Sequence, residues 1–140
     1  MTTPIGLEAS STHEISFGRR ALVLAATVIV RPAARMNPNR LKRLTEILAR
    51  TASPPSAERT MLVRSEVVTC SVRCSGQYCL ERALAVCLLL RLEGSWPTWC
   101  VGARIEPFMA HSWVEVNGIP IGESFDDGFY AKLYEVHSGT

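Results

Sequence analysis

Two stretches decide the fold of this chain: YCLERALAVCLLLRLEG at residues 78–94 and AHSWVEVNGIPIGE at residues 110–123. The first has almost no polar face, which predicts a helix buried on most sides, with Gly94 as its natural C-cap. In the second, Asn117-Gly118 separates two runs of alternating residues, which is a strong signal for a β-hairpin. The chain is therefore organised around a buried helix followed by a hairpin.

The residues before the buried helix also carry helical patterns. Residues 19–30 predict an apolar helix that ends before Pro32, although a run of β-branched residues leaves a strand open. Asn37-Pro38 combines an N-cap with proline at the first helical position, and it opens an amphipathic helix that ends at about Ala49. The first third of the chain is therefore expected to contain two helices.

A third helix follows a short linker at residues 51–55, with Ser56 as its cap. We expect Cys70 and Cys74 to share one face near the end of this helix, before the central helix at residues 77–93. Four apolar side chains are expected to face the core, namely Met61, Leu62, Val68 and Val72.

The pattern changes to strands after Pro97. Helices first and a small antiparallel sheet last predict an α+β domain, with the helices packed on the sheet. The expected strands lie at residues 99–105, 111–116 and 119–123, and a last strand or helix is expected at residues 129–136.

Charge is distributed unevenly along the chain. Residues 1–50 contain eight basic and three acidic residues, whereas residues 51–140 contain seven basic and ten acidic ones. A basic first half can meet an acidic peptide, a partner protein or a membrane surface, or it can simply be a solvated helix face. We predict a helical, partner-docking region at residues 1–55 and a core domain at residues 56–140.

The N-terminus and the cysteines indicate the cellular compartment in which the protein is expected. The start of the chain is polar and lacks the basic residues of a secretory signal, and the apolar run at residues 21–30 is too short to span a bilayer. Five cysteines without such a signal predict reduced cytosolic thiols rather than a disulfide framework. We expect no transmembrane segment, no nucleic-acid partner, no metal and no bound cofactor.

Cys79 and His111 are the candidate catalytic pair. Cys79 lies in the first turn of the central helix, where unpaired backbone N–H groups and the helix dipole favour a thiolate. His111 enters the first strand of the hairpin, and the two together would form the activated nucleophile of a cysteine hydrolase. Either residue alone is compatible with a packing role, but a helix cysteine followed by a strand histidine and a strand acid favours catalysis.

The acid that orients the imidazole is expected after His111. Glu123 is the nearest candidate, with Asp126 and Asp127 behind it. In a regular two-residue hairpin, however, Glu123 points to the face opposite His111. We therefore expect a bulge or strand break at residues 120–122, where a glycine can re-aim the next side chain. A regular ladder would favour Asp126 or leave a dyad.

The runs CLERAL at residues 79–84, LLLR at residues 88–91 and HSWVEVNG at residues 111–118 resemble the transglutaminase-like leader peptidase of lasso peptide biosynthesis. The resemblance covers about residues 57–123. It implies a transglutaminase/papain-like core. The chain is too short for a full recognition domain before this core, so it resembles the free-standing form of the family.

The resemblance implies a papain-like triad and a reaction. Cys79 would be the nucleophile, His111 the general base and then acid, and Glu123 the orienting acid, where the family more often has Asp. The implied activity is that of a bacterial, cytoplasmic cysteine protease that removes the leader peptide from a ribosomally synthesised lasso precursor peptide through a thioester acyl-enzyme. The implied partners are the precursor peptide, a leader-recognition protein and the ATP-dependent lasso cyclase.

Three further residues are weaker candidates for the site. Backbone N–H groups at the helix start are natural oxyanion donors, and Gln77 or Tyr78 would add a side-chain donor. A capping or packing role competes with this function for both residues. Trp113 shares the strand face of His111 and would shield the ion pair from water, although it is equally compatible with a place in the core.

Two other classes of function compete with the peptidase. Cys70, Cys74, Cys79 and His111 could bind zinc as a structural or redox site, although their spacing differs from that of a zinc knuckle. The chain could also be a non-catalytic scaffold module that only assembles partners. Acyl transfer to an amine uses the same triad as hydrolysis and remains open on residues alone.

Overall fold

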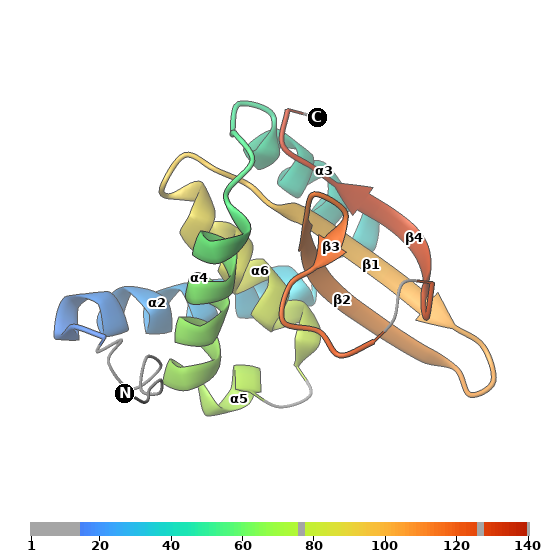
Figure 1. The fold of residues 1–140 in the computed structure, drawn as a ribbon, viewed down its shortest axis with the longest axis horizontal. Coiled ribbons are helices and arrows are strands. Elements are labelled where there is room, and N and C mark those ends of the chain that lie inside the picture. Colours follow the sequence, from blue (N-terminus) through green and yellow to red (C-terminus); the bar gives the residue numbers. More distant parts are fainter. Residues whose placement is uncertain (1–14, 76–77, 126–127, 140) are drawn as a thin grey trace, which may run out of the picture.

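The computed structural model of the chain describes residues 15–75, 78–125 and 128–139. Gln77, Asp126 and Asp127 lie outside the described residues. The helices are α2 (Phe17–Ala34), α3 (Pro38–Ala49), α4 (Ala57–Cys70), α5 (Val72–Ser75) and α6 (Cys79–Arg91), and the strands are β1 (Thr98–Arg104), β2 (Met109–Val116), β3 (Ile119–Pro120) and β4 (Ala131–Val136). Helices α2, α4, α5 and α6 lie on one side of a four-stranded antiparallel sheet and α3 lies beside its strand β4, so the fold is α+β, as predicted (Figure 1).

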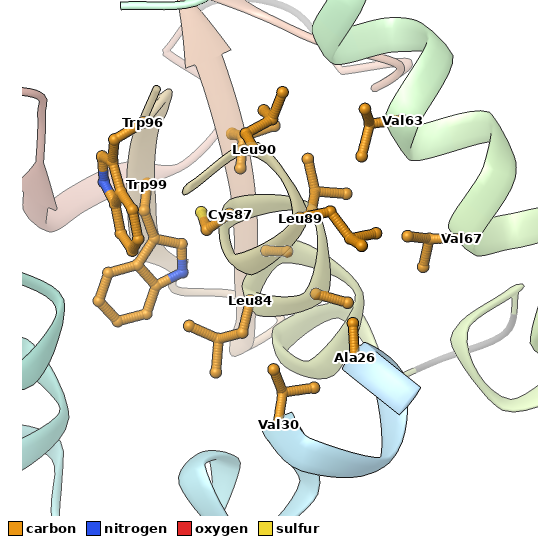
Figure 2. Close-up of a cluster of buried hydrophobic side chains, with 14 of the residues drawn as sticks. Ala26, Val30, Val63, Val67, Leu84, Cys87, Leu89, Leu90, Trp96 and Trp99 are labelled. Atoms are coloured by element: carbon orange, nitrogen blue, oxygen red, sulfur yellow. The ribbon is translucent and has the colours of Figure 1, made fainter. Parts of the chain in front are cut away.

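The predicted central helix is α6, and it is buried on most sides. Helices α2 and α4 pack against it, and so do strands β1 and β2 of the sheet. Its Leu89 and Leu90 are fully buried. Figure 2 shows the apolar side chains that surround α6, among them Ala26, Val30, Val63, Val67, Trp96 and Trp99. The helix therefore lacks a polar face because it is buried on most sides, as predicted.

The predicted helix caps at Asn37 and Ser56 are confirmed. The side chain of Asn37 accepts a hydrogen bond from the backbone N–H of Asn39 at 2.8 Å, and Ser56 accepts one from Arg59 at 3.0 Å. Each cap satisfies a backbone donor that the first helical turn leaves free. These local interactions explain why the starts of α3 and α4 were readable from the sequence.

The prediction that the first helix ends before Pro32 is wrong. Helix α2 continues through Pro32 to Ala34. A proline inside a helix removes one backbone hydrogen bond, and here that loss falls in the last turn, two residues before the helix ends. The strand left open for residues 19–30 is not formed, because Val23, Ala26 and Val30 of α2 bury one helical face in the core.

The predicted buried face of α4 is also wrong. Met61 is exposed, and Val72, which belongs to α5, is 90% exposed. The buried face includes Glu66, whose carboxylate accepts a hydrogen bond from Arg19 of α2 at 2.8 Å. A carboxylate can be buried when a paired cation offsets its desolvation, and the apolar pattern of the sequence does not reveal a partner on another helix. The side chains that α4 does bury are Thr60, Val63, Glu66 and Val67.

The core crosses the boundary that was predicted at residue 55. Val23 and Leu41, which precede it, belong to the same hydrophobic cluster as Val67 and Leu89, which follow it. The helices of the first part of the chain are therefore packed on the core domain. Whether residues 1–55 dock a partner stays a prediction.

The sheet has the strand order β3-β2-β1-β4. Strands β2 and β3 form the predicted hairpin, in which Asn117 and Gly118 both adopt positive φ and Val116 pairs with Ile119. Strand β3 ends at Pro120, and Gly122 has a φ of +73°, so the predicted strand break at residues 120–122 is confirmed. The last segment is strand β4, which pairs with β1.

Candidate active site

Cys79 is the first residue of α6, and its thiol is half-buried. Burial raises the pKa of this thiol, but hydrogen bonds from the His111 side chain and the Ser112 backbone, together with the positive charges of His111 and Arg82, lower the pKa by more. The net result is a pKa below the ordinary value for cysteine. The start of α6 is therefore a place where a thiolate is stabilised.

The other cysteines with perturbed pKa values behave in the opposite way. Burial raises the pKa of the Cys74, Cys87 and Cys100 thiols. A raised pKa keeps the thiol neutral and unreactive. Cys79 thus differs chemically from the cysteines that the core contains.

His111 lies between Cys79 and Glu123. Its Nε2 is 2.8 Å from Oε1 of Glu123, which leaves Nδ1 as the ring nitrogen for Cys79. The hydrogen bond with Cys79, followed by the one with Glu123, raises the pKa of His111 to about 9. At neutral pH the imidazole is therefore protonated, and the three side chains can hold a thiolate, an imidazolium and a carboxylate in series.

Glu123 reaches His111 because the chain leaves the sheet before it. Gly122 adopts a left-handed conformation, and a Cβ atom at this position would lie 2.6 Å from Cδ of Arg64. Glycine is therefore favoured by the backbone turn, and a Cβ atom here would displace the end of the Arg64 side chain. The guanidinium of Arg64 lies 3.4 Å from Oε2 of Glu123 and balances the charge of this nearly buried carboxylate.

Aromatic rings surround the imidazole. Trp113 stacks on His111 with ring centroids 5.7 Å apart, Tyr130 stacks at 5.2 Å, and Phe125 makes an edge contact at 5.7 Å. Gly102, which pairs with His111 across the sheet, leaves room for Trp113, since a Cβ atom there would lie 2.8 Å from the indole. These rings exclude water from one side of the ion pair, where a lower dielectric strengthens charge interactions.

The structure brings Cys79, His111 and Glu123 together, and it places Trp113 beside them. Tyr78 precedes Cys79 at the N-cap of α6, makes no side-chain capping hydrogen bond and stacks under the guanidinium of Arg73 at 3.9 Å. Gln77 is outside the described residues, so its expected role stays a prediction.

The sequence analysis did not assign Arg64, Phe125 and Tyr130 to the site. The crowding of aromatic residues between positions 125 and 130 was a usable signal for a ring cluster near the acid. Arg64 had no signal, because it contacts Glu123 across 59 positions of sequence.

The alternative prediction, a zinc site, is wrong. Helix α4 ends at Cys70, Ser71 adopts an extended conformation, and Cys74 lies in the separate helix α5, so these two cysteines do not share a helix face. In the described part of the chain, the four predicted ligands do not come close enough together to bind one metal ion. Among the described residues, the side chains that do approach each other closely enough are Cys100, Glu115 and Glu135.

The carboxylates of Glu115 and Glu135 are already paired with a lysine side chain. The ammonium of Lys132 lies 2.9 Å from Glu115 and 3.0 Å from Glu135. This arrangement satisfies the carboxylates without a metal ion.

Comparison with known protein families gives a match that covers most of the chain. The family model described as the transglutaminase-like superfamily matches residues 18–134, a range that contains Cys79, His111 and Glu123. No curated protein and no solved structure matches the chain.

Proposed function

The chain belongs to the transglutaminase-like superfamily, and on this basis we propose that it is a cysteine peptidase whose nucleophile is Cys79. The observation that carries the proposal is the series of hydrogen bonds from the Cys79 thiol through His111 to Glu123. The same superfamily includes peptidases and acyltransferases, and both begin with attack of a thiolate on a carbonyl carbon.

The proposed reaction has two steps. The Cys79 thiolate attacks the scissile carbonyl carbon, and the oxyanion that forms would be stabilised by backbone N–H groups in the first turn of α6, where an α-helix has no intrahelical acceptor for them. His111 then donates its proton to the departing amine, and the C–N bond breaks to leave a thioester. In the second step His111 takes a proton from water, which attacks the thioester and releases the acid and the thiolate.

Glu123 and the aromatic rings support this chemistry indirectly. Glu123 accepts from Nε2, so it orients the ring and stabilises the imidazolium. Trp113 covers the stacked face of His111 and limits access of water to the ion pair. Tyr78 remains a weaker candidate for an additional donor, and its exposure allows it to contact a substrate.

We further propose that the substrate is a ribosomally synthesised lasso precursor peptide, cleaved between leader and core. The support is the resemblance of residues 79–84, 88–91 and 111–118 to the leader peptidases of lasso peptide biosynthesis. The protein would act in the bacterial cytoplasm with a leader-recognition protein and a cyclase. The basic surface of α3 (Pro38–Ala49) and exposed apolar residues of α2 such as Ile29 are the candidate docking surfaces. None of the helices in the described residues is long and apolar enough to cross a membrane.

The test is cleavage of the precursor encoded beside the gene, in the presence of the leader-binding protein, followed by mass spectrometry. We expect separate leader and core masses with the natural protein and a loss of rate of about a thousandfold or more with Cys79→Ala. Cys70→Ala is the matched control, because Cys70 is also half-buried but lies outside the hydrogen-bonded series.

The outcomes separate the competing functions. Full pathway output with Cys79→Ala would identify a scaffold and refute the peptidase. A product that carries an added amine would identify acyl transfer in place of hydrolysis. An uncut precursor with the natural protein would count against the assigned substrate.

A further inference from the structure

A cleft of about 310 Å³ opens beside Cys79 and His111, and both residues form part of its wall. The rest of the wall is largely apolar. Helices α2 and α3 and the turn between them contribute one side, including Met36 and Leu41, and the sheet contributes the other, including Leu133 of β4. Helix α3 lies beside β4, as Figure 1 shows, so the cleft is bounded by the first part of the chain and by its last strand.

The cleft has the size and lining of a side-chain pocket. A dry cavity of about 150 Å³ lined by aliphatic and aromatic residues is large enough for benzene. A cleft about twice as large therefore accommodates one large aliphatic or aromatic side chain. Its volume is at the lower end of the range of about 300–1,000 Å³ that is typical of pockets for whole small molecules.

A second hollow also adjoins Cys79, and it differs in character although it shares Ala34 and Leu80 with the apolar cleft. It is more open, and it is lined by the charged residues Arg35, Arg73 and Glu81 together with Tyr78. Cys79 therefore lies at the border between an apolar cleft and a polar one. A peptide that crosses Cys79 would place different kinds of side chain on the two sides of the scissile bond.

We propose that the apolar cleft binds a large apolar side chain of the substrate peptide, at the first or the second position before the bond that Cys79 attacks. This inference rests on the proposed function and adds the substrate class that the site selects. It also assigns Met36, Leu41 and Leu133 as specificity-determining residues, so the first part of the chain helps to choose the substrate.

The test uses probes that need no knowledge of the natural precursor. Peptidyl vinyl sulfones alkylate an activated cysteine, and two series would carry Leu, Phe, Ala or Asp at the first or the second position before the electrophile. In one of the series we expect the Leu or Phe probe to label Cys79 at least about tenfold faster than the Ala probe, because burial of an apolar side chain favours binding by about this factor or more. The Asp probe should be the slowest.

Leu133→Asn tests the pocket itself. Leu133 is 64% exposed at the rim of the cleft, so the change should not disturb folding, and we expect the Leu-to-Ala rate ratio to fall about threefold or more. Ile119→Asn is the matched control: Ile119 is 63% exposed and lies on β3, at the opposite edge of the same sheet. It should leave the ratio unchanged.

Iodoacetamide separates a failure of this inference from a failure of the proposed function. This small reagent reports the Cys79 thiolate without using the cleft, and its rate should be the same in all three proteins. Fast alkylation by iodoacetamide with equal rates for all vinyl sulfones would overturn the inference and leave the nucleophile standing. Alkylation of Cys79 no faster than that of free cysteine would overturn the proposed function and this inference with it.

Discussion

Replacement of Glu123 by Gln should lower the pKa of His111, and it should shift the alkaline limit of activity to lower pH. The carboxylate accepts a hydrogen bond from Nε2 of His111 at 2.8 Å, and its negative charge stabilises the imidazolium. Gln keeps the size and a hydrogen-bonding oxygen but removes the charge. The variant therefore isolates the electrostatic contribution of the third residue.

The size of the effect follows from the partners of His111. The hydrogen bond with Cys79 is the largest cause of the rise in the pKa of His111 from 6.5 to about 9, and Glu123 is the second. Removal of the Glu123 charge should therefore lower this pKa by about one pH unit, at the lower end of what a nearby opposite charge contributes. A group with a raised pKa loses its proton as pH rises through that value. Because the imidazolium is needed to protonate the leaving amine, the alkaline fall of kcat/KM should move to lower pH by the same amount.

Two measurements check this prediction. Titration of the histidine resonances by nuclear magnetic resonance gives the pKa of His111 without any substrate, and precursor cleavage as a function of pH gives the alkaline limb of kcat/KM. Glu46→Gln is the control, since Glu46 makes its ion pair with Lys42 on the surface of α3. An unchanged His111 pKa in Glu123→Gln would refute the role assigned to this carboxylate.

Two further predictions concern stability, and both are measured by urea unfolding. Gly122→Ala should lower the free energy of unfolding by about 1–3 kcal/mol and reduce activity, because the φ of Gly122 is +73° and the new Cβ would clash with the Arg64 side chain. Gly94→Ala is the control. Gly94 has a φ of +86° and no neighbour within 4 Å, so this change should cost only the backbone strain. Equal losses for the two alanine variants would contradict the clash. Leu89→Ala removes a fully buried side chain from the last turn of α6 and should cost about 2–5 kcal/mol, and a loss below about 1 kcal/mol would argue against the packing of this core.

The parts of the fold that were predictable depend on interactions between neighbours in sequence. The cap at Asn37 and the hairpin at Asn117-Gly118 were located correctly because each is formed within a few residues. The buried face of α4 was not, because the burial of Glu66 depends on Arg19, 47 positions away. A pattern of apolar residues identifies a buried face only where that face contains no partnered polar residue.

Sequence patterns alone predict four features of this protein: the α+β class, the buried central helix, the cysteine in its first turn and the break that follows the hairpin. Each of these depends on periodicity, capping or backbone conformation, which are local properties of the chain. Three features depend on tertiary packing. Glu123 meets His111 although a regular hairpin would point it to the opposite face, Arg64 balances its charge, and α3 and β4 enclose an apolar cleft beside Cys79. Those contacts join residues far apart in sequence, and they form only because packing around α6 fixes the distances between the elements that present them.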